Sequence, residues 1–194
     1  MTTEDFESLV IELSQILRTR FFGKYRGTVD EIGTGDKLGY IRAIVPEVYG
    51  ETNPSPWAKP VVPMAGSGYG WLVLPKRGDG VWMEFETGDI SRPIWTGFWW
   101  DDKDELPNPS GVDTRVAITP RGHKFILDDE KDEIRLVHSN SSEFKISGTE
   151  IQLSHSGGSE IKMTSTEILL KIGACQISIT PAAVNINMGS MVVN

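Results

Sequence analysis

The residues of this chain that could do chemistry are three histidines, one cysteine and several adjacent carboxylates. The carboxylate pairs are Asp101/Asp102, Asp128/Asp129 and Asp132/Glu133. Acid–base catalysis needs two such groups in different environments, so that one keeps its proton while the other is ionised. All three pairs lie in charged, turn-like segments. We interpret them as solvated loops and not as a catalytic set.

The histidines and the cysteine are scattered along the chain. His123, His138 and His155 are far apart, and the last two follow apolar strand patterns, so we expect them to face outward. Cys175 has apolar neighbours, which predicts a buried or inert thiol. A single cysteine allows no internal disulfide and no thiolate metal cluster. We therefore predict a protein that is not an enzyme and that holds no metal and no cofactor.

Two glycine-containing stretches could suggest a phosphate site. Gly66, Gly68 and Gly70 lack the strand–helix context of nucleotide-binding loops, and no Lys-Ser/Thr pair or helix follows the turn at residues 156–159. Neither stretch indicates a phosphate site.

A two-beat apolar pattern runs from about residue 125 to residue 188. Each beat is apolar–x–apolar, which is strand alternation with one apolar face. The beats are Phe125/Leu127, Ile134/Leu136, Phe144/Ile146, Ile151/Leu153, Ile161/Met163, Ile168/Leu170, Ile177/Ile179 and Val184/Ile186. Phe144 and Ile161 are 17 residues apart, and Ile161 and Ile177 are 16 apart. A period near 17 with two short strands per repeat predicts a solenoid.

Two apolar doublets per repeat are too few to close a core within one chain. Three copies around a common axis would turn every apolar face inward and pair each strand edge with a neighbour. We therefore predict a homotrimer. Its core residues would be Phe144, Ile146, Ile151, Leu153, Ile161, Met163, Ile168, Leu170, Ile177 and Ile179. The alternative, a left-handed hexapeptide helix, needs an aliphatic residue at every sixth position, which the uneven steps do not supply.

The first segment, residues 1–22, is predicted to be an amphipathic helix over residues 3–20. Phe6, Leu9, Leu13 and Ile16 fall on one helical stripe, together with Val10 and Leu17. The stripe could pack on the helix's own domain, dock on a partner or bundle with its copies.

The second segment, residues 23–100, reads as a small Greek-key barrel such as an OB-fold. Its strand candidates are Tyr25–Ile32, Leu38–Ile44, Gly70–Leu74, Gly80–Phe85 and Pro93–Trp99, with a long loop over residues 51–70. All six tryptophans lie in this segment, and we expect most of them in the core.

The remaining segments are a linker over residues 101–120 and a β-domain over residues 121–194. The linker combines a charge run with Pro107, Pro109 and Gly111. After Lys171 no residue is charged. The net charge of −8 argues against bulk nucleic-acid binding, which needs Lys and Arg against phosphates. The acidic first 20 residues suggest no signal peptide, so we expect folding in the cytosol.

Several short motifs together resemble one known family. They are Leu38-Gly39-Tyr40-Ile41-Arg42-Ala43, Trp57-Ala58-Lys59-Pro60, residues 63–70, Leu74-Pro75, Gly78-Asp79-Gly80-Val81-Trp82, Phe85-x-x-Gly88-Asp89 with Pro93 and Gly97, and Thr119-Pro120-Arg121-Gly122-His123-Lys124-Phe125. The combination resembles the spikes of contractile injection systems: the baseplate assembly protein V of P2-like phages, the cell-puncturing spike of T4-like phages and the VgrG spike of type VI secretion.

The resemblance implies an all-β trimer: an N-terminal helix, an OB-fold collar and a C-terminal triple-stranded intertwined β-helix. Such a spike would be made in the bacterial cytoplasm, sit in a virion tail baseplate or injection-particle tip, and contact the target cell envelope transiently. It implies a baseplate hub protein, for which we predict contacts through Phe6, Leu9, Leu13 and Ile16. It also implies a PAAR-type tip protein, for which we predict docking on Val184, Ile186, Met188, Val192 and Val193.

Two features of the family have no counterpart here. The chain lacks the His-x-His pair with which some P2-like spikes bind iron, and residues 101–120 are too few for a lysozyme domain. Two other functions stay open at this point. One is an OB-fold protein that binds single-stranded nucleic acid and carries a trimerising β-tail. The other is a trimeric fibre or adhesin.

Overall fold

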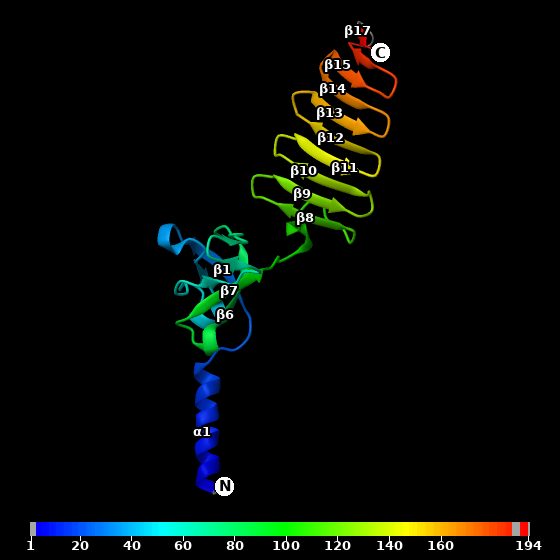
Figure 1. Cartoon of the computed structure of the whole chain (residues 1–194). Coiled ribbons are helices and arrows are strands. Elements are labelled where there is room, and N and C mark those ends of the chain that lie inside the picture. Colours follow the sequence, from blue (N-terminus) through cyan, green and yellow to red (C-terminus); the bar gives the residue numbers. More distant parts are fainter. Residues whose placement is uncertain (1–2, 188–190, 194) are drawn as a thin grey trace. The chain divides into compact units, whose positions relative to one another are not determined.

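The computed structural model describes residues 3–187 and 191–193, and it divides into two compact units between Glu105 and Leu106. Figure 1 follows the chain from helix α1 through the strands of the first unit to the long sheet of the second. The prediction of a mostly β chain with an N-terminal helix, an OB-like sheet and a C-terminal β-domain is confirmed. The helices of the described residues include none that is long and apolar enough to cross a membrane.

Helix α1 spans Thr3–Thr19, close to its predicted range. Phe6, Leu9, Leu13 and Ile16 are all exposed, so the stripe does not pack on its own unit. The helix joins the barrel at its C-terminal end, where the Phe21 amide donates to the Gly88 carbonyl at 2.9 Å. Gly88 has a φ of +74°, and an added Cβ would lie 3.1 Å from the Phe21 nitrogen. A side chain at residue 88 would therefore strain this junction.

The first unit is built on a five-stranded sheet in the order β2-β1-β6-β7-β3. Its strands are β1 (Tyr25–Ile32), β2 (Ile41–Ile44), β3 (Lys59–Pro60), β6 (Gly80–Phe85) and β7 (Pro93–Phe98). The unit also has helix α2 (Pro46–Tyr49), the short turns η1 (Gly35–Lys37), η2 (Glu86–Gly88) and η3 (Lys103–Glu105), and a small hairpin of β4 (Ala65–Gly66) and β5 (Tyr69–Gly70). The buried core is Val29, Ile41, Ala43, Val45, Ala58, Val81, Met83 and Trp95.

Two predictions for this unit are wrong. The segment 70–74, expected as a strand, is irregular after Gly70, because its backbone leaves the sheet to form the root of the β4–β5 hairpin. The tryptophans are mostly not core: Trp95 is buried, whereas Trp71 and Trp100 are exposed and the other three are half-buried. The barrel is small enough for aliphatic residues and one indole to fill it.

The second unit is a ten-stranded antiparallel sheet in which each strand pairs with the next one along the chain. Its strands are β8 (Thr114–Ile118), β9 (Lys124–Asp128), β10 (Glu133–Val137), β11 (Glu143–Ser147), β12 (Glu150–Ser154), β13 (Ser159–Thr164), β14 (Ile168–Ile172), β15 (Cys175–Ile179), β16 (Val184–Ile186) and β17 (Met191–Val193). Strand β8 falls within the segment expected as a linker.

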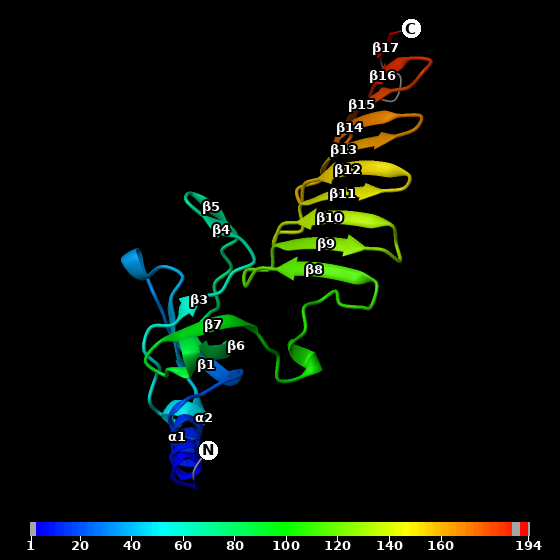
Figure 2. The same ribbon diagram turned by 60° about the horizontal axis from the view of Figure 1, so that its bottom comes forward.

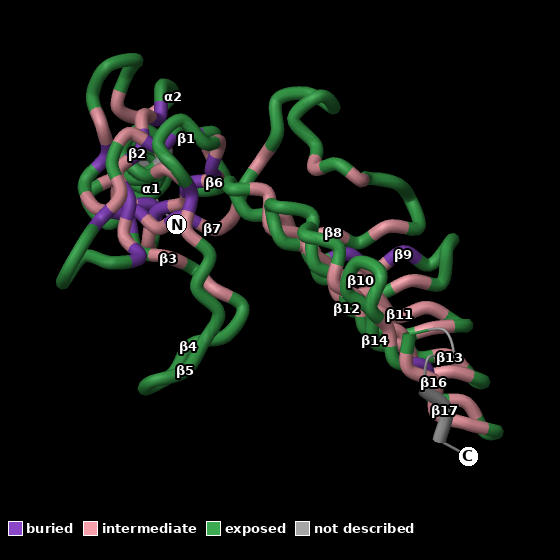
Figure 3. Tube along the Cα trace, turned by 90° about the horizontal axis from the view of Figure 1, so that it is seen from above, coloured by how far each residue is buried: buried purple, intermediate pink, exposed green. Residues whose placement is uncertain are grey.

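The pairing inside this sheet differs from the expected pairing between neighbouring chains. Both hydrogen-bonding edges of every strand from β9 to β16 are used within one chain. The repeat therefore does not need partners to satisfy its backbone, because short turns let each strand fold back on the previous one. What the chain leaves uncovered is its side chains: few residues of this unit are buried, as the colours of Figure 3 show.

Candidate functional site

The most unusual surface of the molecule is one face of the C-terminal sheet, which we call the apolar face. Its side chains form two columns that cross the strands. The first column is Leu127, Ile134, Ile146, Ile151, Met163, Ile168, Ile179 and Val184, and the second is Phe125, Leu136, Phe144, Leu153, Ile161, Leu170, Ile177 and Ile186. Each member lies directly opposite the next across a strand pair. The register thus brings every predicted core residue of the trimer onto one surface.

The apolar face is open to solvent in the single chain. Leu136 and Leu153 are about half exposed, at 50% and 51%. From Leu136 to Ile186 the second column also lines a groove of about 990 Å³, together with turn residues such as His138 and His155. Monomeric proteins rarely expose apolar surface that continues over so many strands, and such surface marks an interaction site.

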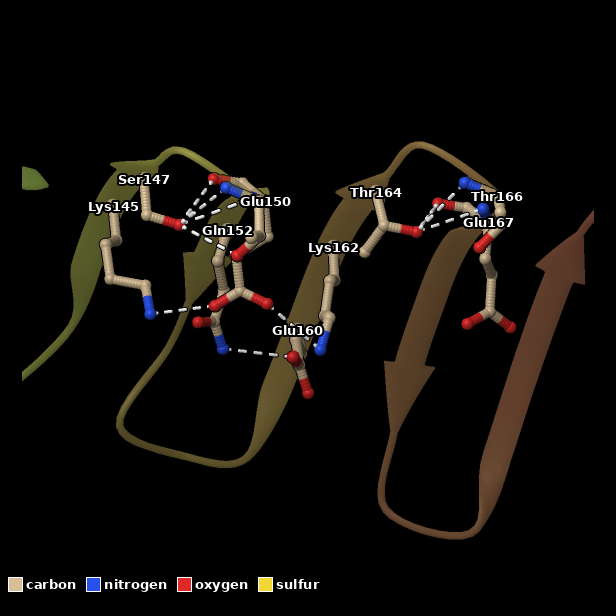
Figure 4. Close-up of polar contacts among 10 residues, drawn as sticks. Lys145, Ser147, Glu150, Gln152, Glu160, Lys162, Thr164, Thr166 and Glu167 are labelled. Atoms are coloured by element: carbon tan, nitrogen blue, oxygen red, sulfur yellow. Dashed lines mark hydrogen bonds and ion pairs between the residues drawn. The ribbon is translucent and has the colours of Figure 1, made fainter. Parts of the chain in front are cut away.

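The opposite face, which we call the polar face, carries a ladder of charges. The Glu150 carboxylate forms ion pairs with the ammonium groups of Lys145 at 2.7 Å and Lys162 at 3.1 Å, and each lysine lies on a neighbouring strand. Gln152 donates to Glu160 at 3.0 Å on the same face. Figure 4 shows these contacts running across β11, β12 and β13. Opposite charges placed across strands stabilise the sheet and keep this face suited to water.

The ladder shifts the ionisation of its members. The hydrogen bond from Lys145, followed by that from Lys162, lowers the pKa of Glu150 below its ordinary value of 4.5. The same bond raises the pKa of Lys145. Because the folded-state pKa of Glu150 lies below the unfolded one, its stabilisation is present above about pH 4.5 and is lost as the pH falls through the folded pKa.

Replacing Glu150 with glutamine is expected to remove this acid-sensitive contribution. The variant should melt below the wild type at neutral pH, and the gap should narrow as the pH falls below about 4.5, because the wild-type carboxylate then becomes protonated. Thermal melting from about pH 7 to about pH 3 measures the gap. Glu130→Gln removes an exposed carboxylate in a turn and should leave the profile unchanged. A gap that stays constant with pH would contradict the assignment.

The turns at one edge of the sheet repeat a hydroxyl-centred contact that the sequence analysis missed. The Ser147 and Thr164 hydroxyls each accept the amides two and three residues on and donate to the carbonyl three residues on. The Thr180 hydroxyl likewise accepts the amide of Ala183, three residues on, and donates to its carbonyl. These residues are spaced by 17 and 16, the same period as the apolar beats. A search for Ser or Thr at that period would have found them.

The histidines occupy the turns at the other edge. Nδ1 of His138 accepts the Asn140 amide at 3.2 Å, and Nδ1 of His155 accepts the Gly157 amide at 2.9 Å. The rings of His123 and His138 lie 4.5 Å apart between centroids. Their imidazoles therefore hold turns. Within residues 3–187 and 191–193, no group of three His, Cys, Asp or Glu residues could hold a metal ion.

Two expectations about single residues are wrong. Asp128, expected in a solvated loop, is 6% exposed and accepts the Lys131 amide at 3.0 Å and its ammonium at 2.6 Å. The bond from the Lys131 side chain, followed by that from its amide, lowers the pKa of Asp128. Cys175, expected to be buried or inert, is not buried: it is exposed, because it begins β15 directly after a turn.

The predicted docking residues fall into two groups. Val184 and Ile186 end the two apolar columns on β16. Met188 lies outside the described residues. For Val192 and Val193 the structure gives the backbone pairing of β17 with β16. The predicted hub residues on α1 share an exposed face of the helix.

The barrel shows the relationship of this chain to known proteins. Residues 25–100 match the family model of the Type VI secretion system/phage-baseplate injector OB domain. The barrel is similar to this injector OB domain. The injector OB domain covers the five-stranded sheet and the β4–β5 hairpin, while α1 and the C-terminal sheet lie outside the match. No curated protein matches the chain.

Proposed function

We propose that this chain is the central spike of a contractile tail or injection-system baseplate and works as a homotrimer. Two observations support the proposal. The injector OB domain links the chain to baseplates. The two exposed columns of the apolar face run over eight consecutive strands, β9 to β16, and the chain has no element that covers them in the described residues.

Three sheets with their apolar faces turned toward a common axis would form a closed shaft. The aliphatic columns would fill its interior, and the ladder around Glu150 would face water. Because each sheet is already hydrogen-bonded within its own chain, the copies would be held by side-chain packing along the whole length of the columns. Such a shaft resists bending and suits force transmission during sheath contraction.

The deciding experiment is the mass of the purified chain in solution. Light scattering at micromolar concentration should give three times the chain mass of 21.5 kDa. A monomeric mass would rule the proposal out, and a dimeric mass would replace the closed shaft with two stacked sheets.

We propose no catalytic role for the spike. The groups weighed for chemistry have structural tasks: Asp128 binds Lys131, while His138 and His155 cap turns. The spike would be made in the bacterial cytoplasm and then reside in the tail baseplate or injection particle. Contraction would drive it briefly into the target cell envelope.

The end of the shaft at β16 and β17 is proposed to bind a small tip protein of the PAAR type. Val184 and Ile186 end the apolar columns there, and no charge follows Lys171. Deleting residues 184–194 should abolish co-purification of the co-expressed tip protein while the mass stays trimeric, because most of each column remains. Retained capture by the shortened trimer would refute the site.

The exposed stripe of α1 is proposed to bind the baseplate hub. Leu13→Glu places a charge in the stripe and should weaken hub binding at least about tenfold, because a carboxylate would be buried without a partner. Ile11→Glu is the matched control, since Ile11 is exposed on the opposite side of the helix. Binding to the co-expressed hub, measured by titration, should be unchanged in the control. Equal effects of both variants would show that the stripe is not the contact.

A further inference from the structure

A second apolar surface projects from the barrel and has no role in the shaft. Residues 60–75, which we call the apolar arm, contain no charged residue, although charged residues make up 24% of the chain. Figure 2 shows its tip, strands β4 and β5, extending away from the β1–β6–β7 sheet. Its exposed apolar side chains are Val61, Met64, Tyr69, Trp71, Leu72 and Val73, at 50% to 65% exposure.

The arm has a fixed root and its own local structure. At the root, the Val61 amide donates to the Trp95 carbonyl on β7 at 2.9 Å. At the tip, Ala65 and Gly66 pair with Gly70 and Tyr69, and the Tyr69 ring lies so close over Gly66 that a Cβ there would be 2.2 Å from it. A hairpin with two residue pairs is marginal in water without a surface to pack on. The exposed rings therefore indicate a surface that covers them in the assembled protein.

We propose that the arm of one copy packs on the barrel of a neighbouring copy, against the exposed Phe98 and Trp100 where the chain leaves β7. This inference rests on the proposed trimer. Trp100 precedes β8 by 14 residues, which span at most about 50 Å. Barrels tethered this closely to a common shaft meet at effective concentrations on the order of millimolar.

The chemistry of the arm and of the surface at Phe98 and Trp100 favours another copy of this chain, and not a different protein, as the partner of the arm. The arm has no charge with which to steer or select a distant partner. Phe98 and Trp100 are 43% and 57% exposed and offer aromatic surface of the same apolar kind. The arm and this aromatic surface are different parts of one chain. A contact between different surfaces can close into a ring when the copies are related by rotation, as three copies on one shaft would be.

The test is photo-crosslinking of the full chain between labelled and unlabelled copies. A ¹⁵N-labelled chain carrying Tyr69→p-benzoylphenylalanine is refolded with an excess of unlabelled wild type and irradiated. We expect heavy–light cross-links that join the arm to the segment carrying Phe98 and Trp100. The inference is overturned, even when the mass is trimeric, if the cross-links are confined to the labelled chains or if none reaches the segment carrying Phe98 and Trp100. A monomeric mass overturns the proposed function as well, so the two failures are distinguishable.

A second measurement covers the case in which the cross-linker disturbs the arm. In the Tyr69→Ser/Trp71→Ser variant, amide hydrogen exchange around Phe98 to Trp100 should become about tenfold faster while the mass stays trimeric. Lys76→Ser, just outside the arm, is the control and should leave this exchange unchanged. Unchanged exchange in the double variant would contradict the contact.

Discussion

Replacing Leu170 with aspartate is expected to convert the proposed trimer into single chains. Leu170 lies in the second apolar column, opposite Ile161 and Ile177. In the proposed shaft, three copies of the new carboxylate would be buried together without partners. Each buried, unpaired charge costs several kcal/mol, so the association constant should fall by more than about a thousandfold. Light scattering of the purified variant measures the loss.

Leu169→Asp is the matched control, because it makes the same change one residue away on the polar face. Leu169 lies opposite Lys162 and Ser178, so the new carboxylate gains a cationic neighbour. The control should stay trimeric. If both variants were trimeric, the apolar face would not be the contact between copies. If both dissociated, strand disruption would be the cause.

Replacing Trp95 with alanine is expected to destabilise the barrel more than any change at its other tryptophans. The indole is 2% exposed, packs in the core and donates from Nε1 to the Gly39 carbonyl at 3.0 Å. Its removal leaves a large cavity and an unpaired carbonyl, which together should lower the free energy of unfolding by about 3–5 kcal/mol. Denaturant unfolding monitored by hydrogen exchange in β1 and β6 measures this loss.

Trp82→Ala supplies the comparison on the neighbouring strand. Trp82 is half-buried, and the Arg26 guanidinium lies 5.9 Å from its ring. Removing it should cost about 1–2 kcal/mol, because part of its surface already faces water. Equal losses in the two variants would mean that Trp95 does not form the centre of the core.

The C-terminal sheet shows how much of this protein could be predicted from its sequence. The apolar–x–apolar beats predicted which side chains share a face of each strand, such as Ile151 and Leu153, and the structure places them on one face. Strand alternation has a strict period of two, so the face on which each side chain lies follows directly from the pattern. The same pattern could not show that the strands pair within one chain, because the backbone hydrogen bonds carry no signature in side-chain types.

The barrel was less predictable because its elements depend on tertiary contacts. Strand β3 is two residues long and forms only by lying parallel to β7. Tryptophan composition suggested that most of the six indoles are in the core, but burial depends on the side of a twisted strand on which each one lies. The sequence also gave no sign that residues 60–75 stand away from the sheet, since an apolar segment reads alike whether it is buried or projecting.

The sequence by itself determined the secondary structure of the tail, the alternation of its faces and the family of its barrel, because these depend on local periodicity and short motifs. Only the tertiary structure decided that the strands of the tail pair in chain order and that Asp128 is buried under Lys131. It also showed that the columns, the stripe of α1 and the arm all lie open to solvent. Exposure is a property of what the rest of the chain fails to cover, and no local pattern contains that information.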